Sequence, residues 1–126
     1  MGYHGVAKDL FQLAKADAHR REAATVPCLY RNVDRIKAGL TAKINAATYT
    51  IVIVGQYANA PHPKQNLIGF KNWINFEIAQ SKSARNKIVA VKLDRTYESP
   101  DELMGSGASW AMAFTEDAIL RALSEA

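Results

Sequence analysis

The sequence predicts an α/β domain in which a parallel sheet is covered by helices on both faces. Ile51–Val54 is an uninterrupted apolar run, as expected for a strand buried on both faces of a parallel sheet. A helical pattern follows over about residues 70–84, and a second apolar run, Ile88–Leu93, comes next. From residue 31 onward helices and strands alternate, which is the pattern of a helix-covered parallel sheet.

The elements before the first buried strand are less regular. Residues 5–24 are rich in helix formers but carry only a partial apolar stripe, and residues 26–30 suggest a short strand. Asn32 is the expected N-cap of a helix over about residues 32–47, because apolar residues recur at helical spacing after it. The buried strand is expected over Thr48–Val54.

The second half of the chain begins with a long connection, Gln56–Asn72. Connections of this length in compact domains are usually functional or mobile. After the helix over about residues 70–84 and the strand Ile88–Leu93, Ser109–Phe114 is expected to form a third strand. Thr115 is expected to cap a last helix. The side chains expected to face inward from that helix are Ile119, Leu120 and Leu123.

Length and composition favour a single domain over residues 1–126, long enough to bury a substantial core. The lone Cys28 rules out an internal disulfide framework. Because no window resembles a membrane span or a signal peptide, we expect a cytoplasmic protein without a membrane partner.

The net charge of +4 is unevenly distributed along the chain. Residues 1–95 carry 15 Lys and Arg against 6 Asp and Glu, whereas residues 96–126 carry 1 against 6. A basic region attracts phosphate-bearing ligands such as dinucleotides. The basic residues are scattered singly without interleaved aromatics, so we expect most of them on solvated helix faces and no nucleic-acid partner.

The candidate site residues flank the long connection. In open parallel sheets, ligands bind where strands end and helices begin. Gly55 ends the first buried strand, Gln56 and Tyr57 follow it, and Trp73 and Glu77 lie four residues apart on one helix face. Most helix glutamates are solvated charges, but a strand end, a long loop and an adjacent aromatic ring make Glu77 a candidate functional carboxylate.

Two of these residues also have structural explanations. Tyr57 lines the mouth of the crevice or packs under the loop, with equal weight, whereas Gly55 admits a ligand or, as is commoner, turns the chain sharply. Ile74 and Ile78 project about 100° away from Trp73 and Glu77, so we expect them to pack on the sheet.

Other chemical motifs are absent from the sequence. The three histidines, His4, His19 and His62, have no metal-ligand spacing with one another or with Cys28. We therefore expect no metal site and place each histidine at the surface. Gly105-Ser-Gly107 precedes a strand and does not join a strand to a helix, so it is not a dinucleotide fingerprint.

As an ordered set, these residues resemble the TIR domain, and most of all the bacterial ThsB-like TIR family of the Thoeris anti-phage system. Ile51–Gly55 and Tyr57 match the third strand of that family and its exit, and Trp73-Ile-Asn-Phe-Glu77 matches its Trp-x-x-x-Glu helix. Asn86–Leu93 matches the strand that follows. The resemblance covers roughly residues 31–94.

The resemblance implies a flavodoxin-like fold and an NAD-processing activity, either a glycohydrolase or a cyclase. Glu77 inherits the role of the catalytic residue, and Gly55, Gln56, Tyr57 and Trp73 fall at the substrate-binding positions. NAD is then the substrate, and no cofactor is implied. The resemblance also implies a homo-oligomer and a phage-derived activator, whose recognition turns on synthesis of an NAD-derived signal.

The beginning of the chain departs from the family pattern. Family members open with an apolar first strand, whereas Met1–Gly5 leads almost directly into a helical segment. The first strand is therefore missing or rebuilt, which leaves a sheet edge that a partner chain can pair. Two alternatives follow: a non-catalytic TIR-like adaptor, and a nucleoside deoxyribosyltransferase-like enzyme, which also breaks N-glycosidic bonds.

Overall fold

The computed structural model describes residues 30–126 of the chain. The helix expected over residues 5–24 and all but the last residue of the strand expected over 26–30 lie outside this part. The described elements are α2 (Tyr30–Ala46), β1 (Tyr49–Val54), α3 (Gln65–Ile68), α4 (Trp73–Ser83), β2 (Lys87–Lys92), the 3-10 helix η1 (Asp101–Leu103), β3 (Ser109–Ala111) and α5 (Glu116–Glu125). The predicted alternation is confirmed, with α3 and η1 as additions.

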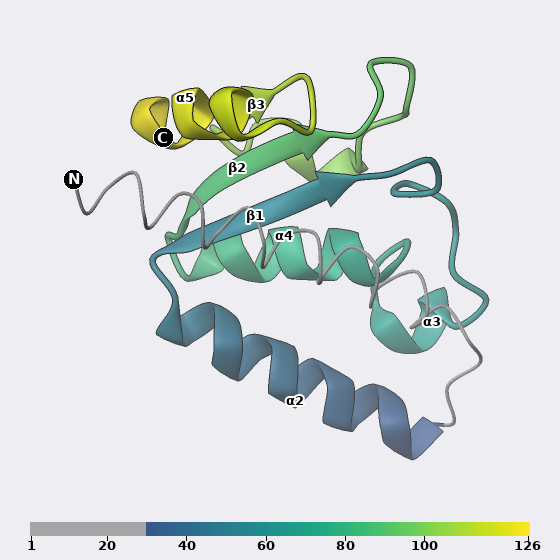
Figure 1. Ribbon diagram of the computed structural model, residues 1–126. Coiled ribbons are helices and arrows are strands. Elements are labelled where there is room, and N and C mark those ends of the chain that lie inside the picture. Colours follow the sequence, from purple (N-terminus) through teal and green to yellow (C-terminus); the bar gives the residue numbers. More distant parts are fainter. Residues whose placement is uncertain (1–29) are drawn as a thin grey trace.

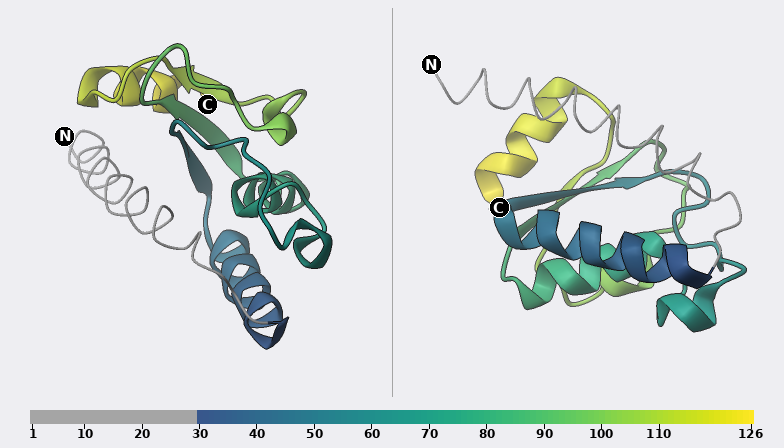
Figure 2. Two further views of the ribbon diagram at one scale, coloured as in Figure 1. Left: turned by 90° about the vertical axis from the view of Figure 1, so that its right-hand side faces the viewer. Right: turned by 90° about the horizontal axis from the view of Figure 1, so that it is seen from below.

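The described strands form a parallel sheet in the order β1-β2-β3, with helices on both faces. Helix α5 covers one face, α4 covers the other, and α2 lies outside α4 (Figures 1 and 2). A crossover connection joins each parallel pair, as parallel pairing requires: α3 and α4 lie between β1 and β2, and η1 lies between β2 and β3. The predicted α/β class with a helix-flanked parallel sheet is therefore confirmed.

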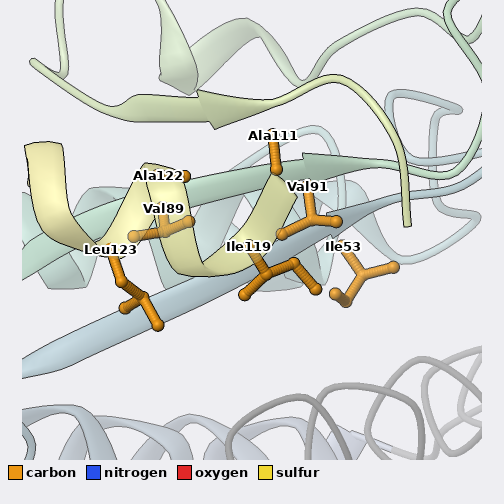
Figure 3. Close-up of a cluster of buried hydrophobic side chains, with 7 residues drawn as sticks. All are labelled: Ile53, Val89, Val91, Ala111, Ile119, Ala122 and Leu123. Carbon is orange, nitrogen blue, oxygen red and sulfur yellow. The ribbon is translucent and has the colours of Figure 1, made fainter. Parts of the chain in front are cut away.

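Side chains of β1 alternate between the two helical layers, as the apolar run predicts. Val52 and Val54 join a buried cluster with Ile78 of α4, whereas Ile53 belongs to a cluster with Ile119 of α5. Figure 3 shows this second cluster, in which strand and α5 side chains meet. Burial on both faces is what makes the sequence of this strand continuously apolar.

Two predicted helix starts differ from the structure. Helix α2 already includes Tyr30, so the predicted N-cap at Asn32 is wrong. Neither residue before Asn32 breaks a helix, and an exposed asparagine is tolerated inside a first turn. Helix α4 begins at Trp73, where Asn72 caps it by accepting a 2.9 Å hydrogen bond from the backbone N–H of Asn75.

At the C-terminal end of the chain, β3 is shorter than predicted and the cap of the last helix is confirmed. Pairing with β2 stops at Ala111, and the chain then turns toward α5. Thr115 caps α5 by accepting a 3.2 Å hydrogen bond from Ala118 N–H. Of the three side chains expected to face inward, Ile119 and Leu123 are buried and Leu120 is half-buried.

Among residues 30–126, no helix combines the length and the apolar character needed to cross a membrane.

Replacing Ile78 by alanine tests whether α4 is held to the sheet by apolar packing. Ile78 is fully buried against β1 and β2, so Ile78→Ala should lower the free energy of unfolding by about 2–5 kcal/mol in urea denaturation. Met104→Ala is the control, because Met104 is 87% exposed and its loss should change stability by less than about 0.5 kcal/mol. Equal effects of the two substitutions would contradict the packing described.

Candidate functional site

The segments that flank the candidate site meet at the edge of the sheet where the parallel strands end. The connection after β1, the start of α4 and the connection after β2 all lie at this edge (Figure 1). Three buried asparagines, Asn59, Asn72 and Asn75, join these segments and are called the asparagine cluster below. The position is the one at which open α/β sheets bind ligands.

Asn72 ties the connection after β1 to the first turn of α4. Its Oδ1 caps the helix, and its Nδ2 donates to the carbonyl oxygens of Ala58 at 2.8 Å and Ala60 at 2.9 Å. A single side chain therefore satisfies one helix N–H and two loop carbonyls. This explains why the helix starts at Trp73 and why the predicted long loop has a defined course.

The other two asparagines bring in the connection after β2. Asn59 Oδ1 accepts from the Asp101 backbone N–H at 3.0 Å, and Asn59 Nδ2 donates to the carboxylates of Asp101 and Glu98. Asn75 Oδ1 accepts from the Glu102 backbone N–H at 2.9 Å. The amide groups of the cluster thus join the two connections through hydrogen bonds. The sequence analysis did not predict this structural role.

Glu77 is buried, with 6% of its surface exposed. The expectation for a typical helix glutamate, a solvated charge, does not apply to it. On the helical wheel Glu77 lies between Phe76, which packs with Val33 of α2, and Ile78, which packs on the sheet. A carboxyl group at this depth has lost most of its contact with water, a loss that other polar groups must replace.

The neighbours of Glu77 on its helix face define the corner that it occupies. Ser81, one turn later, has its Oγ 2.8 Å from Thr50 Oγ1 of β1, so this side of α4 faces β1. Trp73, one turn earlier, is half-buried and packs edge-to-face on Phe76, with ring centroids 5.7 Å apart. Glu77 therefore projects into the angle between α2, α4 and β1.

His62 was expected at the surface, and this prediction is wrong: its side chain is 6% exposed. His62 N–H donates to the Lys71 carbonyl at 2.8 Å and the His62 carbonyl accepts from Gln65 N–H at 3.0 Å. These bonds hold the imidazole edge-to-face with Trp73, with ring centroids 6.5 Å apart. Burial by contacts of this kind gives the sequence no recognisable pattern around the histidine, so the burial of His62 could not be predicted.

The protonation of His62 follows from its surroundings. Its Nδ1 accepts a 2.9 Å hydrogen bond from the backbone N–H of Lys64, so in the neutral ring the proton sits on Nε2. Burial, and secondarily the charge of Lys64, lower the pKa of His62 below its ordinary value. At neutral pH His62 therefore presents an uncharged Nε2–H donor.

The three predicted residues at the end of β1 are placed differently from Glu77. Tyr57 is 73% exposed, so it does not pack under the loop, and Gln56 is also exposed. A Cβ added at Gly55 would meet only Leu93 Cδ1 at an ordinary 3.8 Å, so the local backbone does not demand glycine. The structure brings Trp73, Glu77 and His62 into one region and leaves Gln56 and Tyr57 in solvent.

Within the described residues no group of three or more His, Cys, Asp and Glu side chains is placed to hold a metal ion. Cys28, His4 and His19 lie outside this part of the chain. Comparison with protein-family models, with curated protein sequences and with solved structures finds no match to this chain.

The asparagine cluster can be tested with an isosteric charge. Asn59→Asp replaces an N–H donor by a carboxylate that faces the acceptor oxygens of Glu98 and Asp101. We expect the free energy of unfolding at pH 7 to fall by about 1–3 kcal/mol. Repulsion raises the pKa of the introduced carboxyl, so stability should partly recover as the pH falls and that carboxyl is protonated.

Asn66→Asp, at an exposed position of α3, is the matched control for this charge change. It should leave the unfolding free energy almost unchanged and independent of pH over the same range. A similar loss in both variants would show that Asn59 has no special role.

His62 should make the stability of the fold depend on pH. Because its pKa is lowered in the folded state, the unfolded chain binds more protons between the folded pKa and about 6.5. The free energy of unfolding should therefore be greatest above about pH 6.5 and should decrease as the pH falls below it. Urea denaturation from about pH 5 to 8 should show a smaller decrease in the free energy of unfolding for His62→Gln than for the unsubstituted protein. Identical pH dependence in the two proteins would contradict a lowered pKa of His62.

Proposed function

We propose that this protein is a TIR-like, NAD-processing enzyme with a flavodoxin-like fold, and that Glu77 is its catalytic residue. The observation that carries the proposal is the burial of Glu77 on the helix that directly follows β1. Ligands of open parallel sheets bind near the strand ends, so a buried carboxyl group in that position is a candidate catalytic group.

The arrangement of the strands supports the flavodoxin-like part of the proposal. Parallel strands in the order β1-β2-β3, with α4 on one face and α5 on the other, correspond to one side of a doubly wound sheet. In the described residues β1 is the edge strand. A flavodoxin-like sheet would continue beyond β1 with further strands, from this chain or from a second copy.

The chemistry of NAD explains why one carboxylate is sufficient. The glycosidic nitrogen of the nicotinamide already carries a positive charge, so the carbon–nitrogen bond breaks with its electron pair going to a neutral leaving group, and no acid is needed. Ordinary glycosidases need an acid for the leaving oxygen as well as a second carboxylate. The remaining task is to stabilise an oxocarbenium-like ribose, which a fixed negative charge at Glu77 performs.

The neighbourhood of Glu77 also bears on the fate of the ribose. The Trp73 ring lies on the same helix face and packs against Phe76, which gives the site an apolar wall. A wall of this kind restricts water, and restricted water favours attack by a group of the substrate itself. We therefore propose that cyclisation competes with hydrolysis, as expected for a signal-producing enzyme of bacterial anti-phage defence.

The proposal is tested by following nicotinamide release from NAD. The full chain, alone and with phage-infected cell extract as the source of activator, should release nicotinamide, and Glu77→Gln should reduce the rate by at least about a hundredfold. Glu125→Gln, the same chemical change at an exposed position of α5, should retain the full rate.

Two results would contradict this assignment. Equal turnover by Glu77→Gln and Glu125→Gln would remove Glu77 from the mechanism. Base exchange on deoxynucleosides, with no action on NAD, would instead identify the deoxyribosyltransferase-like activity.

A non-catalytic TIR-like adaptor is the second candidate, and the exposed apolar side chains near the other edge of the sheet favour it. Trp110 on the short edge strand β3 and Met112, which directly follows that strand, are exposed. Exposed apolar groups beside a sheet edge are typical of protein interfaces. An adaptor would self-associate equally well with Glu77→Gln and would form no nucleotide product with any activator, as sedimentation and product analysis would show.

A further inference from the structure

Two hydrogen-bond donors near the start of α4 are buried but bond to nothing within residues 30–126. These donors are His62 Nε2 and Trp73 Nε1. The rings that carry them are in edge-to-face contact, with centroids 6.5 Å apart. Because the His62 side chain is more than nine-tenths buried, its donor cannot turn to bulk water.

Leaving two donors without acceptors costs free energy that the fold could easily have avoided. A buried polar group without a partner typically costs about 1–3 kcal/mol. A phenylalanine in place of Trp73 would fill similar space without an N–H. The position of His62 is moreover fixed by three hydrogen bonds: its N–H donates to the Lys71 carbonyl, its carbonyl accepts from Gln65 N–H, and its Nδ1 accepts from Lys64 N–H. Such a costly and well-anchored pair of donors indicates an acceptor supplied from outside the chain.

The chemistry of the pair selects the acceptor. Both donors are uncharged, because Nδ1 of His62 is already occupied by the Lys64 N–H and the proton is on Nε2. A cation would be repelled by two N–H groups, and an anion would be buried next to the carboxylate of Glu77, one helical turn from Trp73. An uncharged oxygen avoids both penalties, and a bond from each N–H to such an oxygen spans about 2.9 Å.

We propose that His62 Nε2 and Trp73 Nε1 bind the carboxamide oxygen of a nicotinamide group, so that His62 is a substrate-positioning residue. This inference rests on the proposed NAD-processing function, and it assigns the nicotinamide end of the substrate to these two rings. The carboxamide oxygen accepts hydrogen bonds from both N–H groups. The NH2 group of the same carboxamide donates toward the Glu77 side of the site. Both nitrogens are covered in this structure, so binding requires the side chains that cover them to move.

The test uses the two tryptophans of the chain. Trp73 and Trp110 give two indole N–H signals in a ¹H–¹⁵N spectrum, and Trp110, which is 39% exposed on β3, is the internal reference. Nicotinamide should shift the Trp73 and His62 signals saturably and leave Trp110 unchanged. 3-Picoline, which has the same ring with a methyl group in place of the carboxamide, should bind at least tenfold more weakly.

Two variants at His62 distinguish the contribution of its N–H donor to nicotinamide binding from that of its ring shape. His62→Phe keeps a ring but removes the donor, and should weaken nicotinamide binding roughly tenfold. His62→Gln places an amide N–H near the position of Nε2 and should retain most of the affinity. The inference is overturned if nicotinamide causes no saturable shift, if 3-picoline or inorganic phosphate binds as well, or if the Trp73 indole contacts only an ordered water that nicotinamide does not displace.

The nicotinamide site and the proposed NAD-processing function can be tested independently of each other. Glu77→Gln should lose nicotinamide release from NAD while keeping the Trp73 shift with free nicotinamide. Saturable nicotinamide binding in a chain that cleaves no NAD under any condition would uphold this site and refute the enzyme. NAD cleavage that depends on Glu77 but is unchanged in His62→Phe would uphold the enzyme and refute the nicotinamide site.

Discussion

The packing of α4 against the parallel pair β1 and β2 is the constraint on which the rest of the structure depends. Ile78, with Ile74 beside it, fixes one side of this helix on the sheet. The helix rotation set in this way determines the direction of every other side chain on it. Phe76 then packs toward α2, and Glu77 falls in the corner between these two contacts. The burial of the candidate catalytic group is therefore a consequence of apolar packing and of helical geometry.

The asparagine cluster sets the position of α4 along its axis in the same way as the apolar contacts set its rotation. Amide side chains both donate and accept, so three of them can join two loops and a helix end while satisfying one another. Carboxylates in these positions could accept only, and hydroxyls would be too short. These bonds join the start of α4 to both connections, and support of this kind is what a site needs to hold reacting groups in position.

The sequence predicted the architecture well and the surroundings of the candidate site only in part. Continuous apolar runs and helical periodicity revealed β1, β2, α4 and α5, because burial of these elements imposes a pattern on neighbouring residues. The burial of His62 and the linkage between Asn59 and Asp101 depend on contacts between residues distant in the chain, and such contacts leave no local pattern. The cap of α2 was misplaced for a related reason: an asparagine is favourable at an N-cap but also tolerated inside an exposed first turn.

The central claim is that the buried carboxylate of Glu77 faces the ribose of a bound dinucleotide. A structure of the chain with carba-NAD, in which a methylene group replaces the ribose ring oxygen so that the bond to nicotinamide resists cleavage, tests it most directly. The account predicts the anomeric carbon in van der Waals contact with the Glu77 carboxylate and the carboxamide oxygen between the His62 and Trp73 rings. A dinucleotide bound elsewhere on the molecule, with Glu77 in contact with protein groups alone, would contradict the account.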